Sequence, residues 1–455
     1  MIIQFKNRFR ELSELREVLN SDKFEFIIIY GRRRVGKTEL ILKATENTRR
    51  FYFLATEKDN LRRFYESCLN YSKDFEHVKM SWEAIFNTLK NKTSVIIIDE
   101  FQNMIKEDKS ILSTFQLIID TILKQTRIKL FLLGSSISII TSETLSYKSP
   151  LYGRRTGSFL LKPVKFKDLT HFFKTSVEEL IKIYSFADGI PHYLNMIKPP
   201  FTKWLNEKLH KRRSFIKDEI DFLTRYEFED PSTYKLILKA IALGKTKVSE
   251  IRDYLNLKRT DLSQYLRNLI NVGMIKREVP ITESIKSKQG RYYIIDNFLN
   301  FWFRFIFPNL SLVEEGVFTL NTTEFNQYLG LVFEKVCKEF LLNTRIINYT
   351  RIGKQWGKFK GEKGKNTYEI DIIALNENTK EILFSECKWK NRVNAERIIR
   401  DLVRKAEHVN WFNKERKEEF CVFAKSFSKK ITEFNGKKTH CFDLKDIERM
   451  LKKTR

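Results

Sequence analysis

The stretch GRRRVGKT, residues 31–38, decides how the N-terminal part of this chain folds. It fits the phosphate-binding pattern G-x-x-x-x-G-K-[ST], whose glycines let backbone N–H groups surround a phosphate group. The apolar run 26–30 before it predicts a buried strand, and residues 39–44 after it predict the start of a helix. A strand, a glycine loop and a helix N-terminus in this order are typical of a phosphate-binding unit. The alternative is a turn that contains Gly and Lys by chance in a basic chain. Such a turn would not be expected to have a strand before it and a helix after it.

The residues of this loop have distinct roles if a nucleoside triphosphate binds there. Lys37 would reach the β- and γ-phosphates, and the Thr38 hydroxyl would bind Mg²⁺. The expected cofactors are therefore ATP or ADP and Mg²⁺. The residues expected to surround the phosphates are Gly31, Arg32, Arg33, Arg34, Val35, Gly36, Lys37 and Thr38.

A second nucleotide-site signal follows the apolar run 94–98, which predicts another buried strand and leads into Asp99 and Glu100. Asp99 would complete the Mg²⁺ shell, and Glu100 would orient and deprotonate the attacking water. Because the carboxyl ends of parallel strands meet at one edge of a sheet, we expect Asp99 to lie near Lys37. A strand that merely ends in acidic residues is the alternative, and the loop upstream argues against it.

Two further segments could complete this site, and both also have a plainer interpretation. Ser135 and Ser136 follow a buried apolar run, and either could sense the γ-phosphate or cap the next helix. Arg154 and Arg155 lie in a basic turn before the next predicted strand. One of them could act on the phosphates as an arginine finger, or the turn could simply lie on the surface.

The pattern of apolar residues divides the chain into successive segments. Alternating strands and helices over residues 1–165 predict an α/β fold, a parallel sheet with helices on both faces. Residues 166–230 lose the strand pattern and predict a helical lid, and residues 231–305 predict three short helices and a hairpin, as in a winged helix-turn-helix. A connector at 306–324 and an α/β domain at 325–455 complete the chain.

The expected partner is nucleic acid, most simply double-stranded DNA. A formal net charge of +27 suits a polyanion. The predicted third helix of the winged segment, 259–269, carries Arg259, Ser263, Gln264 and Arg267, which suit phosphates and base edges. A winged helix that contacts protein, and a lysine-rich surface without a partner, are the alternatives.

The sequence gives no sign of a membrane segment or of an oxidising compartment. No apolar run approaches the roughly 18 residues of a membrane span, and the first residues lack the apolar core of a signal peptide. We therefore expect a cytoplasmic protein without a membrane partner. The five cysteines are scattered without a C-x-x-C pair, so they indicate neither zinc nor a disulfide framework.

The last domain holds a second group of charged residues. The runs 368–375 and 381–389 predict a hairpin in which Asp371 falls opposite Glu386, and Lys388 shares a face with Glu386. Two carboxylates and a lysine at one place can bind Mg²⁺ and stabilise the transition state of phosphodiester cleavage. The alternative is a charged hairpin with a solvated face.

The first 200 or so residues resemble the archaeal ATPase family of the AAA+/STAND class of P-loop ATPases. The segments that carry the resemblance are 7–12, 31–38, 96–100, 134–135, 152–156 and 189–194. In this family the lead-in 7–12 lies by the adenine, which implies a nucleotide contact for Arg8. Phe9 stands where an acidic residue is usual in the family.

Residues 292–308 and 386–389 resemble the C-terminal domain that often follows this ATPase. That domain is similar to the restriction-endonuclease-like PD-(D/E)XK fold, a nuclease fold. The resemblance implies that Glu334, on the helix before the hairpin, joins Asp371 and Glu386 as metal ligands, and that Lys388 is catalytic.

These features predict an ATP-binding protein, a Mg²⁺-dependent ATPase that acts as a nucleotide-driven switch coupled to DNA binding. Self-association through the ATPase domain would let Arg154 act in cis or in trans. The C-terminal domain would cut DNA in one interpretation. In the other, the chain is a non-cleaving regulator or scaffold whose C-terminal domains bind only protein or DNA.

Overall fold

The structure is a computed structural model that spans residues 1–455. The residues that it describes are 7–211, 214–256, 262–359 and 366–453. The chain divides into two compact units. The first comprises Met1–Val164 and Ile190–Asn195, and the second comprises Lys165–Gly189 and Met196–Arg455.

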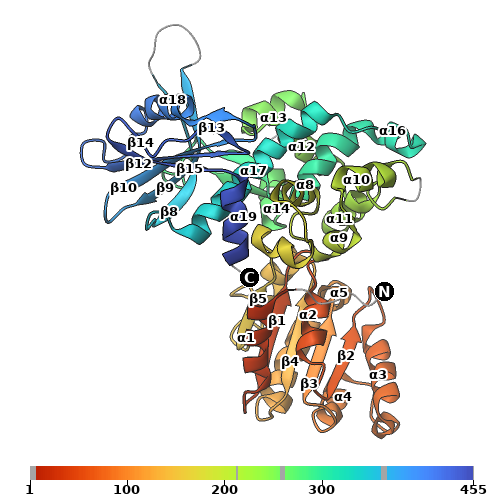
Figure 1. Ribbon diagram of the computed structural model, residues 1–455. Helices are drawn as coiled ribbons and strands as arrows, with labels where there is room; N and C mark the ends of the chain where they lie inside the picture. Colours follow the sequence, from red (N-terminus) through yellow and green to blue (C-terminus); the bar gives the residue numbers. More distant parts are fainter. Residues whose placement is uncertain (1–6, 212–213, 257–261, 360–365, 454–455) are drawn as a thin grey trace. The chain divides into compact units, whose positions relative to one another are not determined.

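Five parallel strands form the sheet of the first unit, in the order β2-β3-β4-β1-β5 (Figure 1). Their bounds are β1 Glu25–Tyr30, β2 Arg50–Leu54, β3 Val95–Asp99, β4 Lys129–Gly134 and β5 Gly157–Leu160. The predicted parallel α/β sheet is therefore confirmed. Because β4 lies between β1 and β3, the carboxyl ends of these three strands are neighbours at one edge of the sheet.

Helices cover both faces of this sheet, because side chains of successive strand residues point to opposite faces. On one face, Leu15 of α1 (Phe9–Leu19) and Leu40 of α2 (Lys37–Ala44) belong to the same buried cluster as Ile27 of β1. Helix α2 begins at Lys37, within the glycine loop 31–38, and the loop follows the carboxyl end of β1 directly.

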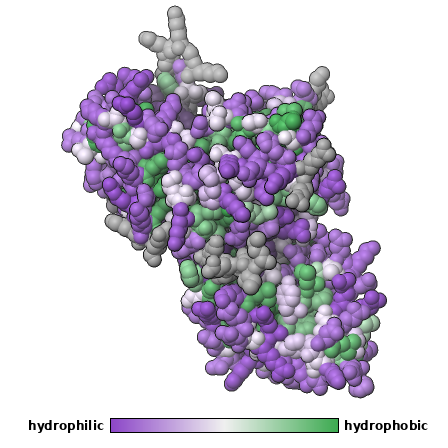
Figure 2. Space-filling view, turned by 45° about the vertical axis from the view of Figure 1, so that its right-hand side comes forward, coloured by the Kyte–Doolittle hydropathy of each residue, from purple (hydrophilic) through white to green (hydrophobic). Residues whose placement is uncertain are grey.

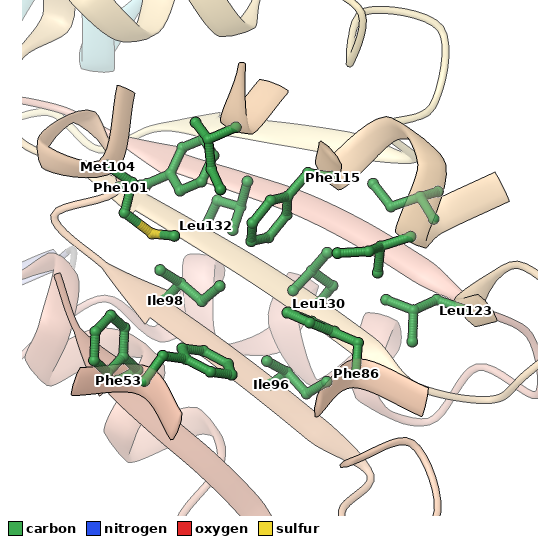
Figure 3. Packing of buried hydrophobic residues seen from close by; sticks show 14 of the residues in the cluster. Phe53, Phe86, Ile96, Ile98, Phe101, Met104, Phe115, Leu123, Leu130 and Leu132 are labelled. Carbon is green, nitrogen blue, oxygen red and sulfur yellow. The ribbon is translucent and has the colours of Figure 1, made fainter. Parts of the chain in front are cut away.

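A larger apolar core fills the other face (Figure 3). Phe86 and Phe115 come from helices, Ile96 and Leu130 come from β3 and β4, and all four are fully buried. Burying each such side chain stabilises the fold by about 1.5–3 kcal/mol. The helices on this face are α3 (Asn60–Tyr71), α4 (Trp82–Leu89) and α6 (Ile111–Ile118). Shorter helical segments are η1 (Lys73–Phe75), α5 (Gln102–Glu107), η2 (Ile119–Leu123), α7 (Ile137–Ile139), η3 (Ile140–Thr144) and α9 (Pro191–Met196), the last within this unit up to Asn195.

The second unit begins with a helical region. Its helices are η4 (Phe166–His171), α8 (Val177–Ala187), α10 (Phe201–Leu209) and α11 (Glu219–Glu227). The aromatic segments α15 (Asn297–Phe301) and η5 (Trp302–Ile306) pack against α8, where the ring centroids of Phe186 and Phe298 are 5.0 Å apart. Trp302 donates its indole N–H to a backbone carbonyl of the same helical region at 2.6 Å. The aromatic run of the sequence therefore forms a core between this region and the helices that follow.

Three helices and a hairpin follow, as expected for a winged helix-turn-helix. They are α12 (Ser232–Ala242), α13 (Val248–Tyr254), α14 (Ser263–Asn271), and the antiparallel strands β6 (Ile275–Glu278) and β7 (Arg291–Ile294). Helix α14 buries Leu266 and Leu269 and exposes Gln264 and Arg267. Arg259, which the sequence placed on this helix, lies outside the described residues.

A six-stranded sheet, β14-β15-β12-β10-β9-β8, forms the last part of the second unit (Figure 1). Its strands are β8 (Arg351–Lys358), β9 (Thr367–Asn376), β10 (Glu381–Lys388), β12 (Lys417–Ala424), β14 (Glu433–Phe434) and β15 (Lys437–Phe442), and β11 (Val393–Asn394) pairs separately with β13 (Phe427–Lys429). The helices are η6 (Phe307–Asn309), α16 (Leu310–Glu315), α17 (Thr322–Thr344), α18 (Ala395–Glu407) and α19 (Leu444–Lys453). The segment 306–324, which was expected to be a connector, thus contains helices η6 and α16.

Helices α17 and α18 lie on opposite faces of this sheet. Phe340 of α17 contacts Phe423 of β12, whereas Leu402 of α18 packs in the cluster that contains Val422, the neighbouring residue on the same strand. Because neighbouring residues of a strand point to opposite faces, the two helices cover different sides.

The loop between β6 and β7 is paired with the edge strand β8. Ile281 donates its backbone N–H to the carbonyl of Lys354 at 2.9 Å, and Trp356 donates its indole N–H to the carbonyl of Gln289 at 3.1 Å. Arg291 forms a 2.8 Å ion pair with Glu369. The loop therefore covers an edge that would otherwise present unpaired backbone groups. The sequence did not predict this contact.

The surface is mainly hydrophilic, as expected for a chain in which 31% of the residues are charged (Figure 2). Hydrophilic residues dominate the face seen in Figure 2, with apolar residues scattered between them. Within the described part of the chain, no helix has the length and apolar character needed to cross a membrane.

Candidate functional site

The glycine loop has the backbone conformation that its sequence predicts. Gly31 has φ +153° and Gly36 has φ +89°, values that side-chain-bearing residues rarely adopt. A Cβ atom on Gly31 would lie 2.4 Å from the carbonyl oxygen of Leu161, so a larger residue would clash with backbone. The loop therefore needs glycine here for both conformation and space.

Lys37 is buried at the centre of the loop. Its ammonium group donates to the carbonyl oxygens of Gly31 at 2.9 Å and Arg32 at 3.2 Å, and to the hydroxyl of Ser135 at 2.9 Å. Burial lowers the pKa of Lys37, while the charges of Glu100 and Asp99 act in the opposite direction. The ammonium is thus held where the loop, β3 and β4 meet.

Asp99 connects the second motif to the loop. Its carboxylate accepts a 2.5 Å hydrogen bond from the Thr38 hydroxyl and a 3.0 Å bond from the Tyr52 hydroxyl. Burial raises the pKa of Asp99, and these two hydrogen bonds act against the rise. Tyr52 was missed by sequence reasoning because it lies on β2, and only pairing of β2 with β3 places it beside Asp99.

Ser135 lies between Lys37 and Glu100. Its hydroxyl donates to the Glu100 carboxylate at 2.6 Å while it accepts from Lys37. This placement follows from the strand order, because Ser135 comes directly after β4, the strand between β1 and β3. The side chain of Ser136 instead accepts from the backbone N–H of Ile139, so Ser136 caps α7. The two serines, which the sequence could not separate, therefore have different roles.

Glu100 is held in a restricted geometry. Its φ of +54° is unusual for a residue with a side chain, and its N–H donates to the Asp99 carboxylate at 2.8 Å. Gln102 donates its side-chain amide to the Glu100 carboxylate, and its amide oxygen accepts from the Ser135 backbone N–H at 3.2 Å. Gln102, which the sequence analysis did not single out, thus fixes the orientation of Glu100. Strained backbone of this kind often occurs at functional sites.

Arg8 supports the loop from the outside. Its guanidinium donates to the carbonyl oxygens of Val35 at 3.2 Å and Lys162 at 2.6 Å, and to the carboxylate of Glu11 at 2.9 Å. Phe9, next to it, is 69% exposed. The Arg8 side chain therefore contacts the backbone of the phosphate loop. The family resemblance implies an adenine contact for Arg8 as well.

The two candidate finger arginines have partners of their own. Arg154 donates to both oxygens of the Asp120 carboxylate, at 2.6–3.0 Å, and to the carbonyl of Pro150 at 2.7 Å. The Arg155 guanidinium lies 4.9 Å from the ring centroid of Tyr152. In this structure, a role on phosphates would require Arg154 to leave Asp120.

The nucleotide-site residues fit a triphosphate with Mg²⁺. Lys37 presents a cation inside a loop of turned backbone, and α2 begins at the same residue. Thr38 and Asp99 bring a hydroxyl and a carboxylate together, and Mg²⁺ prefers such oxygen ligands. The Thr38 and Asp99 oxygens could therefore hold the ion, with Glu100 beside them.

The C-terminal hairpin has the predicted register. Ser385 of β10 pairs with Ile372 of β9. In an antiparallel pair the next residues along are Glu386 on β10 and Asp371 on β9, so these two carboxylates come together. The Asp371 carboxylate accepts a 2.8 Å hydrogen bond from the backbone N–H of Cys387. Burial and the charges of Glu334 and Glu386 raise the pKa of Asp371 to about 7.

Each of the other two carboxylates has a lysine partner. Glu386 is paired with Lys388 at 2.7 Å and with Lys405 of α18 at 3.1 Å. Glu334 of α17 forms an ion pair with Lys354 of β8. Lys354 and Lys405 were missed, since the chain brings them here only by folding. Among the described residues, no group of three or more His, Cys, Asp or Glu side chains is arranged to hold a metal ion.

Three family descriptions match separate parts of the chain. Residues 5–197 match an ATPase domain predominantly from Archaea. Residues 232–277 match the arsR family of bacterial regulatory proteins, and residues 302–399 match archaeal and bacterial proteins of unknown function. The ATPase domain and the helix-turn-helix are thus supported independently of the geometry.

Two relatives come from Methanocaldococcus jannaschii. The uncharacterized protein MJECL04 is 52% identical over 415 residues, which are 89% of this chain and 92% of the relative. The uncharacterized ATP-binding protein MJ0423 is 54% identical over 46 residues, 10% of this chain and 78% of that protein.

A solved structure shares the fold. The Walker-type ATPase PABY2304 of Pyrococcus abyssi has a TM-score of 0.51 and 22% sequence identity, and the match covers 66% of this chain and 96% of that one. At this identity the similarity concerns the fold alone.

Proposed function

This chain belongs to the family of the Methanocaldococcus jannaschii protein MJECL04 and carries an archaeal ATPase domain, and we propose that it binds ATP with Mg²⁺ and hydrolyses it. The observation that carries the proposal is the connected group of Lys37, Thr38, Asp99, Glu100 and Ser135 at adjacent strand ends. These side chains supply a cation, two oxygen ligands and a carboxylate at one place.

The side chains divide the work. Lys37 neutralises negative charge on the phosphates, and Thr38 and Asp99 orient the metal ion. Held by Thr38 and Asp99, Mg²⁺ would stabilise the negative charge that develops during hydrolysis. Glu100 accepts a proton from the attacking water, and Gln102 and Ser135 keep its carboxylate in position.

We further propose that the nucleotide state controls DNA binding, as in a switch. The exposed face of α14, with Gln264 and Arg267, and the net charge of +27 support a DNA partner. The loop between β6 and β7, the wing of the winged helix, is already paired with β8. Helix α14 rather than this loop would therefore make the main contact with DNA.

Isothermal titration of Mg²⁺-ATP into Lys37→Ala tests the central claim. Lys43→Ala is a matched control, because Lys43 lies on the same helix and forms an exposed ion pair with Glu46. We expect Lys37→Ala to lose at least about tenfold in affinity, which is 1.4 kcal/mol, and Lys43→Ala to bind normally. Normal ATP binding by Lys37→Ala would show that the site is elsewhere.

A second candidate function is Mg²⁺-dependent DNA cleavage by the C-terminal domain. Its support is the closeness of Asp371, Glu386 and Lys388, and the burial and the nearby charges of Glu334 and Glu386 that raise the pKa of Asp371. To bind a metal ion, Glu386 and Glu334 would each have to release the lysine with which it is paired. The alternative remains a scaffold that binds DNA or protein without cutting.

Nuclease assays on linear, supercoiled and branched DNA separate these two possibilities. The wild type is compared with Asp371→Ala and Glu386→Ala, with Mg²⁺ or Mn²⁺ and with or without ATP. Cleavage lost in both variants supports the nuclease, and cleavage retained in both identifies a contaminant. No cleavage of any substrate favours the scaffold.

A further inference from the structure

A cavity of about 190 Å³ lies inside the second unit, between the winged helix and the C-terminal sheet. Its walls come from α12, β6, β7, α15, η5, α17, β8 and β9. Ile241 of α12 and Ile372 of β9 contribute apolar surface to it. Because the loop between β6 and β7 is bonded to β8, both walls belong to one packed unit.

Five basic side chains line this cavity. They are Lys276, Arg304, Lys335, Lys338 and Lys354. They come from four separate elements, so the fold rather than a local charge run gathers them. Like charges in a partly buried space repel one another, and an anion in the space would relieve that repulsion.

Most of these cations already have protein partners, but one does not. Lys354 is paired with Glu334, and Lys276 is paired with Glu278 at 2.5 Å. Lys335 donates to the carbonyl of Ile295 at 2.8 Å. Within the described parts of the chain, the partly buried Lys338 ammonium has neither an ion pair nor a hydrogen bond.

The cavity also presents acceptors for a polar ligand. The side-chain oxygen of Asn300 is buried without a hydrogen-bond partner among the described residues, and Asn300 lines the cavity. Buried polar atoms are nearly always satisfied, so this orphaned oxygen indicates a missing donor. The carboxylates of Glu278 and Asp371 line the same space.

We propose that this cavity binds a small phosphate monoester, a nucleoside or sugar monophosphate, with its phosphate on Lys338 and its hydroxyl or amino groups on Asn300 and the carboxylates. A volume of about 190 Å³ lies below the usual range for drug-sized ligands and does not admit a DNA duplex. The site is separate from the glycine loop and does not depend on ATP binding. Since Asp371 and Glu334 line it, a bound ligand would also occupy the approach to the proposed cleavage residues.

The test is isothermal titration of the full chain with ribose 5-phosphate, AMP and inorganic phosphate. Lys338→Glu reverses the unpaired charge, Lys338→Arg keeps it, and Lys445→Glu makes the same charge change at an exposed position of α19. We expect at least one of the two monoesters to bind, with about tenfold or greater loss in Lys338→Glu and little loss in the two controls. Lys338→Met, which removes the charge with little change in length, should give a smaller loss in the same direction.

The outcomes that overturn the proposal are distinct. Binding that is lost in Lys37→Ala but kept in Lys338→Glu would place the ligand at the glycine loop. Binding of inorganic phosphate alone, or no binding by any of the three probes at millimolar concentration, would also overturn it. Circular dichroism melting shows whether Lys338→Glu is folded, and if it is not, Lys338→Met decides.

Discussion

The hydroxyl of Thr38 donates a 2.5 Å hydrogen bond to the carboxylate of Asp99, and the two residues are 61 positions apart in the chain. This bond joins the glycine loop to the end of β3. It places two oxygen ligands suited to Mg²⁺ beside the Lys37 ammonium.

Gly31→Ala should destabilise the protein and weaken ATP binding. The new methyl group would meet the Leu161 carbonyl oxygen, and φ +153° is unfavourable for alanine. We expect a loss of about 1–3 kcal/mol in the free energy of unfolding, measured with urea. Gly153→Ala is the control, because a Cβ there meets nothing within 4 Å. Equal stability of the two variants would contradict the described loop geometry.

Glu100→Gln should reduce ATP hydrolysis much more than ATP binding. Glutamine keeps the size of the side chain but cannot take a proton from water. General-base catalysis contributes about 10²–10⁴-fold, so we expect kcat to fall by that range while Kd for Mg²⁺-ATP changes little. Glu83→Gln, an exposed residue on α4, should hydrolyse ATP normally. A Glu100→Gln enzyme with wild-type turnover would remove Glu100 from the catalytic role.

Arg267→Ala should weaken DNA binding and make the affinity for DNA less sensitive to salt concentration. Arg267 lies exposed on α14, where it can reach a phosphate. Loss of one phosphate contact lowers the slope of log K against log salt by about 0.9. Fluorescence anisotropy with duplex DNA at several salt concentrations measures both quantities. The exposed Arg225 of α11 supplies the control Arg225→Ala, and identical slopes in the two variants would exclude α14 from the interface.

Asp371 should make stability depend on pH in metal-free buffer. Its pKa is raised to about 7 by burial and by Glu334 and Glu386, whereas the unfolded chain loses this proton near pH 3.9. Between these values the folded state keeps a proton that the unfolded state has released, so the free energy of unfolding falls as pH rises. The loss, relative to Asp371→Asn, should stay below about 1.4 kcal/mol per pH unit.

Urea unfolding in EDTA from about pH 4 to pH 8 measures this difference. The wild type should lose its advantage over Asp371→Asn as pH approaches 7, and the difference should then level off. Asp401→Asn, at an exposed position on α18, should follow the wild type. A difference between wild type and Asp371→Asn that is independent of pH would show that Asp371 titrates normally.

Local patterns were sufficient for the strands, the glycine loop and the hairpin register. The loop could be recognised because its function depends on residues close together in sequence, Gly31, Gly36, Lys37 and Thr38. The register that faces Asp371 with Glu386 could also be counted, because a short turn between antiparallel strands leaves little choice.

The sequence by itself therefore determined the phosphate loop, the parallel sheet around it and the helix-turn-helix, since these depend on backbone conformation and on short-range periodicity. Only the tertiary structure decided that Ser135 connects Lys37 to Glu100, because strand order is not encoded in any local pattern. It also decided that Lys354 and Lys405 neutralise the C-terminal carboxylates. The physical reason is that a buried charge is costly unless an opposite charge lies close to it in space. Which residue lies close is determined by the packing of the elements and not by distance along the sequence.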